Sequence, residues 1–240
     1  MNKKIRLYFS DKIQSDLVAH LKKEQSHYLK DVMRLKAGDI FSVFNSEGEW
    51  SARVQNYEKK STKIKILEKV RDKKNEQNIW LAFTPIKQNP LNFIIQKGTE
   101  LGVQKFIPIL SERSAVKDIN AERIKKVIIE SAEQSNRISV PEIIKLENLK
   151  NFLISFPKKG CLVFCDINCD KSDLKNILSK KDIGPICILI GPEGDFSENE
   201  RQLILDLKQS QPISLAQNIL RAETAAVAAV TLVNYYLNLS

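Results

Sequence analysis

Histidine and cysteine are scarce in this chain of 240 residues, and their placement excludes two kinds of site. The two histidines, His20 and His27, are too few and too close together for a histidine-based metal site or a Ser/His/Asp triad. The four cysteines include no CxxC pair of the kind that zinc sites use. Cys161 and Cys187 lie in apolar runs and are interpreted as small buried hydrophobic residues. We expect no metal site and no structural disulfide.

Long apolar runs are also missing. The longest extends from residue 225 to residue 233, interrupted by Thr231, whereas a spanning helix needs roughly 20 apolar residues. The basic N-terminus has no apolar segment or cleavage site of a signal peptide. We expect a cytoplasmic protein that does not interact with membranes.

Basic residues are in excess, with 38 Lys and Arg against 29 Asp and Glu and a formal charge of +9. Such an excess favours a polyanionic partner, because cations that neutralise phosphates release condensed counterions. The same lysines are equally typical of a solvated surface, so charge alone leaves nucleic-acid binding open.

Two hydrophobic patterns divide the chain. In residues 1–71, alternating runs predict strands, a turn at 45–48 and a short helix over 26–34, which together indicate a small barrel with one basic face. The predicted strands are 7–9, 40–45, 50–57 and 63–70. Residues 72–77 are all polar and are interpreted as an interdomain linker.

From residue 78 to residue 240, uniformly apolar runs alternate with helical patterns. This alternation predicts an α/β domain in which helices cover both faces of a parallel sheet. The predicted strands are 79–83, 106–110, 160–165, 186–190 and 213–215, and helices are expected up to 101 and over 121–136, 172–178, 197–208 and 222–237. Ser197 and Glu200 fit a capping box, and Gly102 is placed to end the helix before it.

The strongest site candidate is the apolar strand that leads into Gly191-Pro192-Glu193-Gly194. Open α/β sheets bind ligands at the carboxyl ends of their strands, and glycine lets a ligand approach the backbone. The alternative is a tight turn that needs glycine for its geometry alone. The loop is neither a P-loop nor a GxGxxG motif.

A second candidate spans residues 215–226, where a loop opens an almost wholly apolar helix. Arg221, Glu223 and Thr224 are the strongly polar groups at the helix start, where free N–H groups can hold a ligand acceptor. The alternative is a first-turn Glu223 that complements the helix dipole and pairs with Arg221.

Three further segments are weaker candidates. Residues 130–137 fit a solvated helix end. Residues 112–114 fit either a loop that contacts phosphate or an ordinary polar loop after a strand. The third is a set of basic residues near the N-terminus, each also typical of a solvated face: Lys3, Lys4, Arg6, Lys30, Arg34 and Lys36.

Taken together, these segments resemble one family. GTELGV (98–103), ERS (112–114), ESAEQSNR (130–137), LIGPEGDFS (189–197) and LRAETAA (220–226) are similar to the enzymes that methylate N3 of a uridine in bacterial 16S ribosomal RNA. Those enzymes belong to the SPOUT class, and the resemblance covers nearly the whole chain.

The resemblance implies an N-terminal PUA-like barrel that contacts RNA and a C-terminal α/β domain with a deep trefoil knot. It also implies a homodimer and S-adenosylmethionine as the cofactor. The implied cofactor residues are Leu189, Ile190, Gly191, Pro192, Glu193, Gly194, Leu215, Leu220, Arg221, Ala222 and Thr224. The implied RNA contacts are Arg6, His27, Arg34, Lys36 and Arg113.

The chain departs from the family pattern at a few positions. Asp195 stands where glycine is expected, Gln217-Asn218 replaces an expected basic residue, and Ser26 replaces a second histidine. Asp195 directly follows the glycine loop, so it bears on the local backbone geometry.

Methylation at N3 requires removal of a proton and alignment of the base with the methyl donor. We hypothesise that Arg221 stabilises developing charge near the methyl group. The candidates for orienting or deprotonating the base are Glu223, Glu133, Asn136 and Arg137. Two alternatives stay open: a SPOUT enzyme that modifies another RNA position, and a non-catalytic RNA-binding assembly factor.

Overall fold

The computed structural model describes residues 5–59, 61–73, 75–169, 174–178 and 184–238. The chain divides into two compact units. The first comprises residues 1–75 and 132–140, and the second comprises residues 76–131 and 141–240. The inclusion of 132–140 in the first unit has no counterpart in the sequence patterns.

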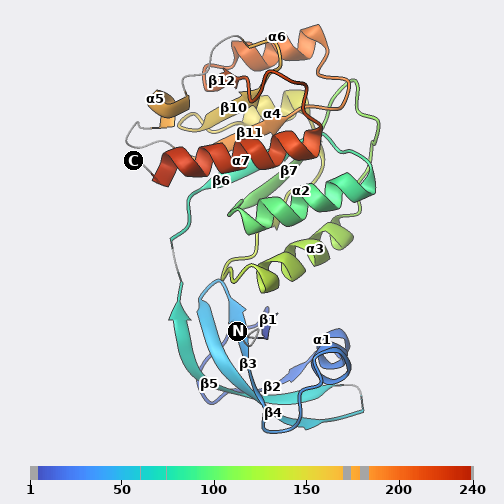
Figure 1. Cartoon of the computed structure of the whole chain (residues 1–240), viewed down its shortest axis with the longest axis vertical. Helices are drawn as coiled ribbons and strands as arrows, with labels where there is room; N and C mark the ends of the chain where they lie inside the picture. The colour runs from blue at the N-terminus through green and yellow to red at the C-terminus, as the bar shows by residue number, and fades with distance from the viewer. Residues whose placement is uncertain (1–4, 60, 74, 170–173, 179–183, 239–240) are drawn as a thin grey trace. The chain divides into compact units, whose positions relative to one another are not determined.

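The first unit is built on a five-stranded sheet in the order β1-β3-β4-β5-β2 (Figure 1). β1 runs parallel to β3, and the other neighbours are antiparallel. A two-residue turn joins β3 to β4 between the paired residues Asn45 and Gly48, as the sequence predicts. The strands are β1 (Arg6–Tyr8), β2 (Val18–Leu21), β3 (Ile40–Asn45), β4 (Gly48–Tyr57) and β5 (Thr62–Asp72).

The predicted helix at 26–34 differs from the observed structure. α1 (Lys23–His27) begins three residues earlier and continues as a π-helical turn, η1 (Tyr28–Val32). Arg34 then adopts a left-handed backbone conformation with φ of 58°. β2 was not predicted, because its four residues are mostly exposed and lack a clear alternation.

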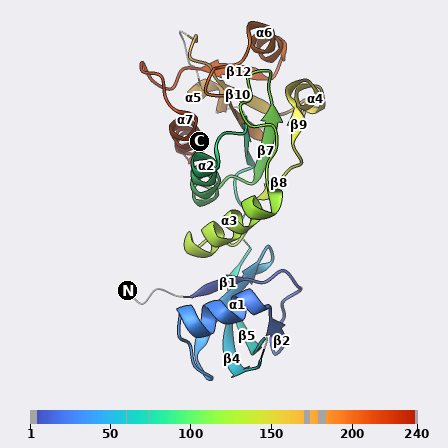
Figure 2. The same ribbon diagram turned by 90° about the vertical axis from the view of Figure 1, so that its right-hand side faces the viewer.

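The second unit contains a parallel sheet in the order β12-β10-β11-β6-β7-β8, and β9 pairs with β7. Helices cover both of its faces, as predicted: α2, α5 and α7 lie on one side, and α4 and α6 on the other (Figures 1 and 2). The strands are β6 (Ile79–Phe83), β7 (Lys105–Leu110), β8 (Glu142–Ile143), β9 (Glu147–Asn148), β10 (Cys161–Cys165), β11 (Ile186–Ile190) and β12 (Ser210–Ile213). The helices are α2 (Gln88–Glu100), α3 (Ala121–Gln134), α4 (Leu149–Ser155), α5 (Leu174–Leu178), α6 (Glu198–Asp206) and α7 (Ala222–Asn238).

Two predictions in this unit need correction. The last strand was expected at 213–215, but β12 spans Ser210–Ile213. The prediction and the observed strand share only Ile213, and Leu215 belongs to the following loop. The helix α4, capped by the Asn148 side chain, was not predicted. Residues 172–173 of another predicted helix lie outside the described residues. Along the described chain, no helix is both long and apolar enough to cross a membrane.

Candidate active site

Two candidate loops leave the same edge of the parallel sheet. β10 lies between β11 and β12, so the carboxyl ends of β11 and β12 are two strand spacings apart, about 10 Å. The loop at 191–197 follows β11, and the loop at 214–221 follows β12. The fold therefore brings together two segments that lie about twenty residues apart in the chain.

The first loop is held by close packing. β11 is buried throughout, and a Cβ atom on the following Gly191 would lie only 3.0 Å from the Phe196 ring. That ring packs edge-on against Phe164 of β10 at 5.8 Å. A side chain at position 191 would therefore press on this ring, while a Cβ at Gly194 would meet nothing within 4 Å. The backbone at Gly194 is thus open to a ligand.

Asp195 preserves the conformation that glycine would adopt. Its φ is 59°, in the left-handed region, where Asp is tolerated better than most residues. Its N–H donates to the Pro192 carbonyl at 3.0 Å, and its carboxylate accepts the Phe196 N–H at 2.8 Å. Asp195 therefore occupies a conformation that glycine also adopts readily.

The segment at 112–114 forms hydrogen bonds that hold the loop at 191–197 in place. Nη1 of Arg113 donates to the carbonyls of Gly194 at 2.9 Å and Phe196 at 3.3 Å. The Glu112 N–H donates to the buried carboxylate of Glu200 at 2.8 Å. Glu200 also completes the capping box with Ser197, which confirms the predicted start of α6. The sequence predicted an RNA contact for Arg113, whereas its observed partners are loop carbonyls.

The second loop ends at the first turn of α7. The Ala225 N–H donates to the Arg221 carbonyl at 2.9 Å, so the N–H groups of Ala222, Glu223 and Thr224 are free of helical partners. Arg221 and Thr224 are exposed, and Leu215 and Leu220 are half-buried. Among the described residues, Arg221 and Glu223 form no ion pair, so the simple pairing considered for them is not observed.

Two residues at this edge were missed by the sequence reasoning. Thr84 follows β6 and is 1% exposed; its N–H donates to Ile190 at 3.1 Å, and its Oγ1 has no hydrogen-bond partner. Asp166 follows β10 and accepts both Nε and Nη2 of Arg201, at 3.1 and 2.9 Å. This hydrogen bonding raises the pKa of Arg201. Both residues directly follow a buried strand, and that position would have identified them.

The catalytic candidates fall into two groups. Arg221 and Glu223 belong to the second unit, whereas Glu133, Asn136 and Arg137 belong to the first. Oε1 of Glu133 accepts the Tyr8 N–H at 2.9 Å. Asn136 ends the helix in the left-handed conformation, and Arg137 is 7% exposed.

Arg6 requires a correction. It was expected among the RNA contacts, but it is 6% exposed, and its guanidinium donates to Glu49 and to the carbonyls of Ala132, Glu133 and Arg137. A guanidinium with these buried protein partners is not available to RNA. His27, Arg34 and Lys36 are exposed on the first unit, and His27 Nδ1 lies 2.6 Å from Asp31.

All four cysteines are free thiols. Cys161 and Cys187 are buried, as predicted. Burial raises the pKa of Cys165 to about 12 and also raises the pKa of Cys187. Within the described ranges, no three His, Cys, Asp or Glu side chains gather in a way that could hold a metal ion.

Comparisons with known proteins agree with this arrangement. Residues 73–234 match the model of the RNA methyltransferase domain, and residues 21–67 match that of the RNA methyltransferase PUA domain. The fold and the site therefore define an RNA methyltransferase of the SPOUT type with an N-terminal PUA-like domain.

The relatives narrow this class further. Ribosomal RNA small subunit methyltransferase E of Rickettsia conorii is 32% identical over 94% of this chain and 93% of its own length. The Bacillus subtilis protein of the same name is 30% identical over 88% of both chains. The Neisseria gonorrhoeae enzyme, crystallised with S-adenosyl methionine, superposes with a TM-score of 0.86 at 26% identity and 97% coverage of both chains. The chain belongs to the ribosomal RNA small subunit methyltransferase E family.

Proposed function

We propose that this protein methylates N3 of a specific uridine in 16S ribosomal RNA, with S-adenosylmethionine as the methyl donor. The observation that carries the proposal is that the open backbone at Gly194 and the first-turn N–H groups of α7, which lack helical partners, belong to loops at one edge of the parallel sheet. The family's small-subunit RNA substrate and the cofactor bound by the Neisseria gonorrhoeae enzyme support it.

The residues at this edge suit the cofactor's chemistry. Half-buried Leu215 and Leu220 offer apolar surface, and the orphaned Thr84 hydroxyl offers a polar contact. When bound, the cofactor supplies an electrophilic methyl group. We propose that it is held by Leu189, Ile190, Gly191, Pro192, Glu193, Gly194, Leu215, Leu220, Arg221, Ala222 and Thr224.

Arg221 and Glu223 are our candidates for acting on the base. The Arg221 guanidinium has no carboxylate partner among the described residues, so it is available to stabilise charge that develops on a uridine oxygen as the N3 proton leaves. We propose that Glu223, half-buried in the first turn of α7, orients the base or accepts that proton. Glu133, Asn136 and Arg137 have main-chain and side-chain contacts within the first unit, so we assign them a supporting role.

The wider organisation follows the same proposal. We propose an RNA-binding domain at 1–71, a linker at 72–77 that begins with the last residue of β5, and a methyltransferase domain at 78–240 whose C-terminal part is knotted and whose residues 132–140 belong to the first compact unit. His27, Arg34, Lys36 and Arg113 are the proposed RNA contacts. A homodimer is supported by the apolar helix α7, on which Tyr235 is 59% exposed, and by Ile219, which is 83% exposed. The substrate implies action in the cytoplasm.

The test is transfer of labelled methyl to small ribosomal subunits that lack the modification, followed by mass spectrometry of the RNA. We expect one methylated uridine, and loss of most turnover in Arg221→Ala at saturating cofactor. Labelled methyl on another nucleotide or on ribose would contradict methylation at N3 of uridine and indicate an enzyme that modifies another RNA position. Failure of the wild-type protein to bind the cofactor in calorimetry would indicate a non-catalytic assembly factor.

A further inference from the structure

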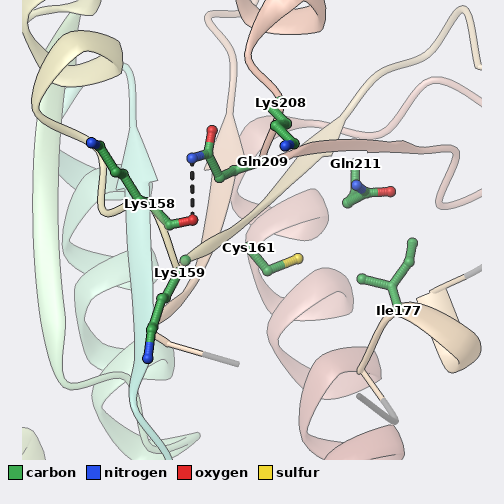
Figure 3. Close-up of a pocket in the computed structure, with 8 residues that line it drawn as sticks. Lys158, Lys159, Cys161, Ile177, Lys208, Gln209 and Gln211 are labelled. Carbon is green, nitrogen blue, oxygen red and sulfur yellow. Dashed lines mark hydrogen bonds between the residues drawn. The ribbon is translucent and has the colours of Figure 1, made fainter. Parts of the chain in front are cut away.

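A cavity of about 550 Å³ lies at the amino end of the parallel sheet (Figure 3). Cys161 begins β10 beside it, Gln209 and Gln211 flank the first residue of β12, and Ile177 comes from α5. Three lysines also line it: Lys158, Lys159 and Lys208. We therefore call it the lysine pocket. β10 spans five residues, so the pocket lies about 15 Å from the carboxyl edge that carries the candidate active site.

The charge of the lysine pocket is of one sign. Lys158, Lys159 and Lys208 are exposed, and no carboxylate is found among the described residues that line the pocket. Across the described part of the chain, none of the three ammonium groups forms an ion pair. Uncompensated cations around a concave surface raise the local concentration of anions. The pocket is therefore suited to a negatively charged ligand.

The neutral groups add hydrogen-bonding capacity. Gln209 Nε2 donates to the Lys158 carbonyl at 3.3 Å, which fixes that amide between two of the lysines. The amide of Gln211 has no hydrogen bond to described residues. In Figure 3 the Lys208 side chain is seen between the amides of Gln209 and Gln211, while the Lys158 and Lys159 side chains point away from Cys161 and Gln211. Lysine stems rotate freely, so these two cations can follow an extended anion along the rim.

The size of the cavity exceeds what a small ion fills. Cavities of roughly 300–1,000 Å³ accommodate ligands of many atoms, far larger than one inorganic phosphate. Lysine and amide donors suit phosphate oxygens, and phosphates receive more than half of typical protein contacts to nucleic acid.

We propose that the lysine pocket binds backbone phosphates of the RNA substrate, as an anchor remote from methyl transfer. The proposal rests on the proposed function, since it takes RNA as the ligand. An anchor of this kind contributes affinity through counterion release, and it leaves the cofactor site untouched.

The test compares two variants with the same change of net charge. The pocket variant carries Lys158→Gln, Lys159→Gln and Lys208→Gln; the control carries Lys126→Gln, Lys145→Gln and Lys150→Gln, three exposed lysines elsewhere in the second unit. Affinity for 16S ribosomal RNA is measured over a range of salt concentrations. Each lost phosphate contact should reduce the slope of log K against log salt by about 0.7 to 0.9, so the pocket variant should lose about 2 to 3 from the slope.

The control should keep the slope of the wild type, and both variants should keep wild-type affinity for S-adenosylmethionine and wild-type melting temperatures. Equal slopes for the two variants would overturn the anchor while leaving methyl transfer by the wild type intact. A wild type that neither binds nor methylates the RNA would overturn both proposals. In a second arm, inorganic phosphate is titrated; binding that depends on the three lysines, with unchanged RNA affinity, would mean a small-anion site instead.

Discussion

Nε of Arg6 lies 3.2 Å from Oε2 of Glu49, and the two side chains are only 4% and 2% exposed. Nη2 of Arg71 approaches the same oxygen at 2.7 Å. One buried carboxylate therefore balances two guanidinium groups in the first unit. Burial lowers the pKa of Arg6, and the charge of Glu49 opposes that shift.

Replacing Glu49 with Gln should strongly destabilise the first unit. The buried Arg6 and the partly buried Arg71 would then lose the carboxylate that they share, and breaking a buried pair in this way costs about 3–5 kcal/mol. The chain has two tryptophans, and Trp50 belongs to the first unit. Urea unfolding followed by Trp50 emission in a Trp80→Phe background measures the effect on that unit.

A matched control is Lys65→Gln, which removes the exposed pair between Lys65 and Asp16. Exposed pairs contribute at most about 1 kcal/mol, so the control should unfold near the wild-type midpoint. If Glu49→Gln were no more destabilising than the control, the ion pairs of Glu49 with Arg6 and Arg71 would not stabilise the first unit.

The two glycines of the first loop should respond differently to alanine. Gly191→Ala places a Cβ 3.0 Å from the buried Phe196 ring and should destabilise the second unit by about 1–3 kcal/mol, as overpacking does. Gly194→Ala has open space and should change stability by less than about 0.5 kcal/mol. Chemical denaturation of the two variants makes the comparison, and equal losses would contradict the packing account.

Replacing Arg113 tests whether its hydrogen bonds hold the loop at 191–197, which we propose binds the cofactor. Arg113→Ala removes the donors to the carbonyls of Gly194 and Phe196, so the loop loses its fixed geometry, and cofactor affinity should fall several-fold. Arg123→Ala, an exposed arginine on α3, serves as the control. Calorimetry with S-adenosylmethionine measures the change. Unchanged cofactor affinity would contradict this loop-holding role and leave Arg113 as a proposed RNA contact alone.

The buried thiol of Cys187 predicts a loss of stability at alkaline pH. Its pKa is raised in the folded protein, so the thiol stays neutral there, while the unfolded chain ionises above a pH of about 8.5. The unfolded state then binds fewer protons, and this contribution to stability falls by about 1.4 kcal/mol per pH unit above that value. The stability advantage of the wild type over Cys187→Ala should therefore be constant from pH 6 to 7.5 and shrink from pH 8.5 to 9.5. A constant difference throughout would contradict the burial effect.

Much of the second unit was predictable, because uniformly apolar runs such as Ile186–Ile190 are typical of strands covered on both faces. Local motifs were equally informative: the capping box at Ser197 and the turn before Gly48 depend on neighbours in the chain. The end of β12 was misplaced, since single residues at a strand terminus carry little periodic signal.

Long-range contacts account for what the sequence reasoning missed. The partners of Arg6 at Ala132 and Arg137 are 126 and 131 residues away, and no local pattern indicates such contacts. The same holds at the site, where Arg113 contacts a carbonyl 81 residues later. The glycine loop was found because strand ends are favoured positions, while Thr84 was passed over because a lone threonine has no distinctive spacing.

The membership of residues 132–140 in the first unit sets an order of events during protein synthesis. Until the ribosome has released residue 137, the buried Arg6 lacks the carbonyl acceptors that complete its hydrogen bonding. The N-terminal unit therefore reaches its final state only after more than half of the polypeptide has emerged. A shortened chain that stops at the polar stretch after β5 would keep the pair between Arg6 and Glu49 but lack the carbonyl acceptors of Arg6, and it would be prone to degradation in the cell.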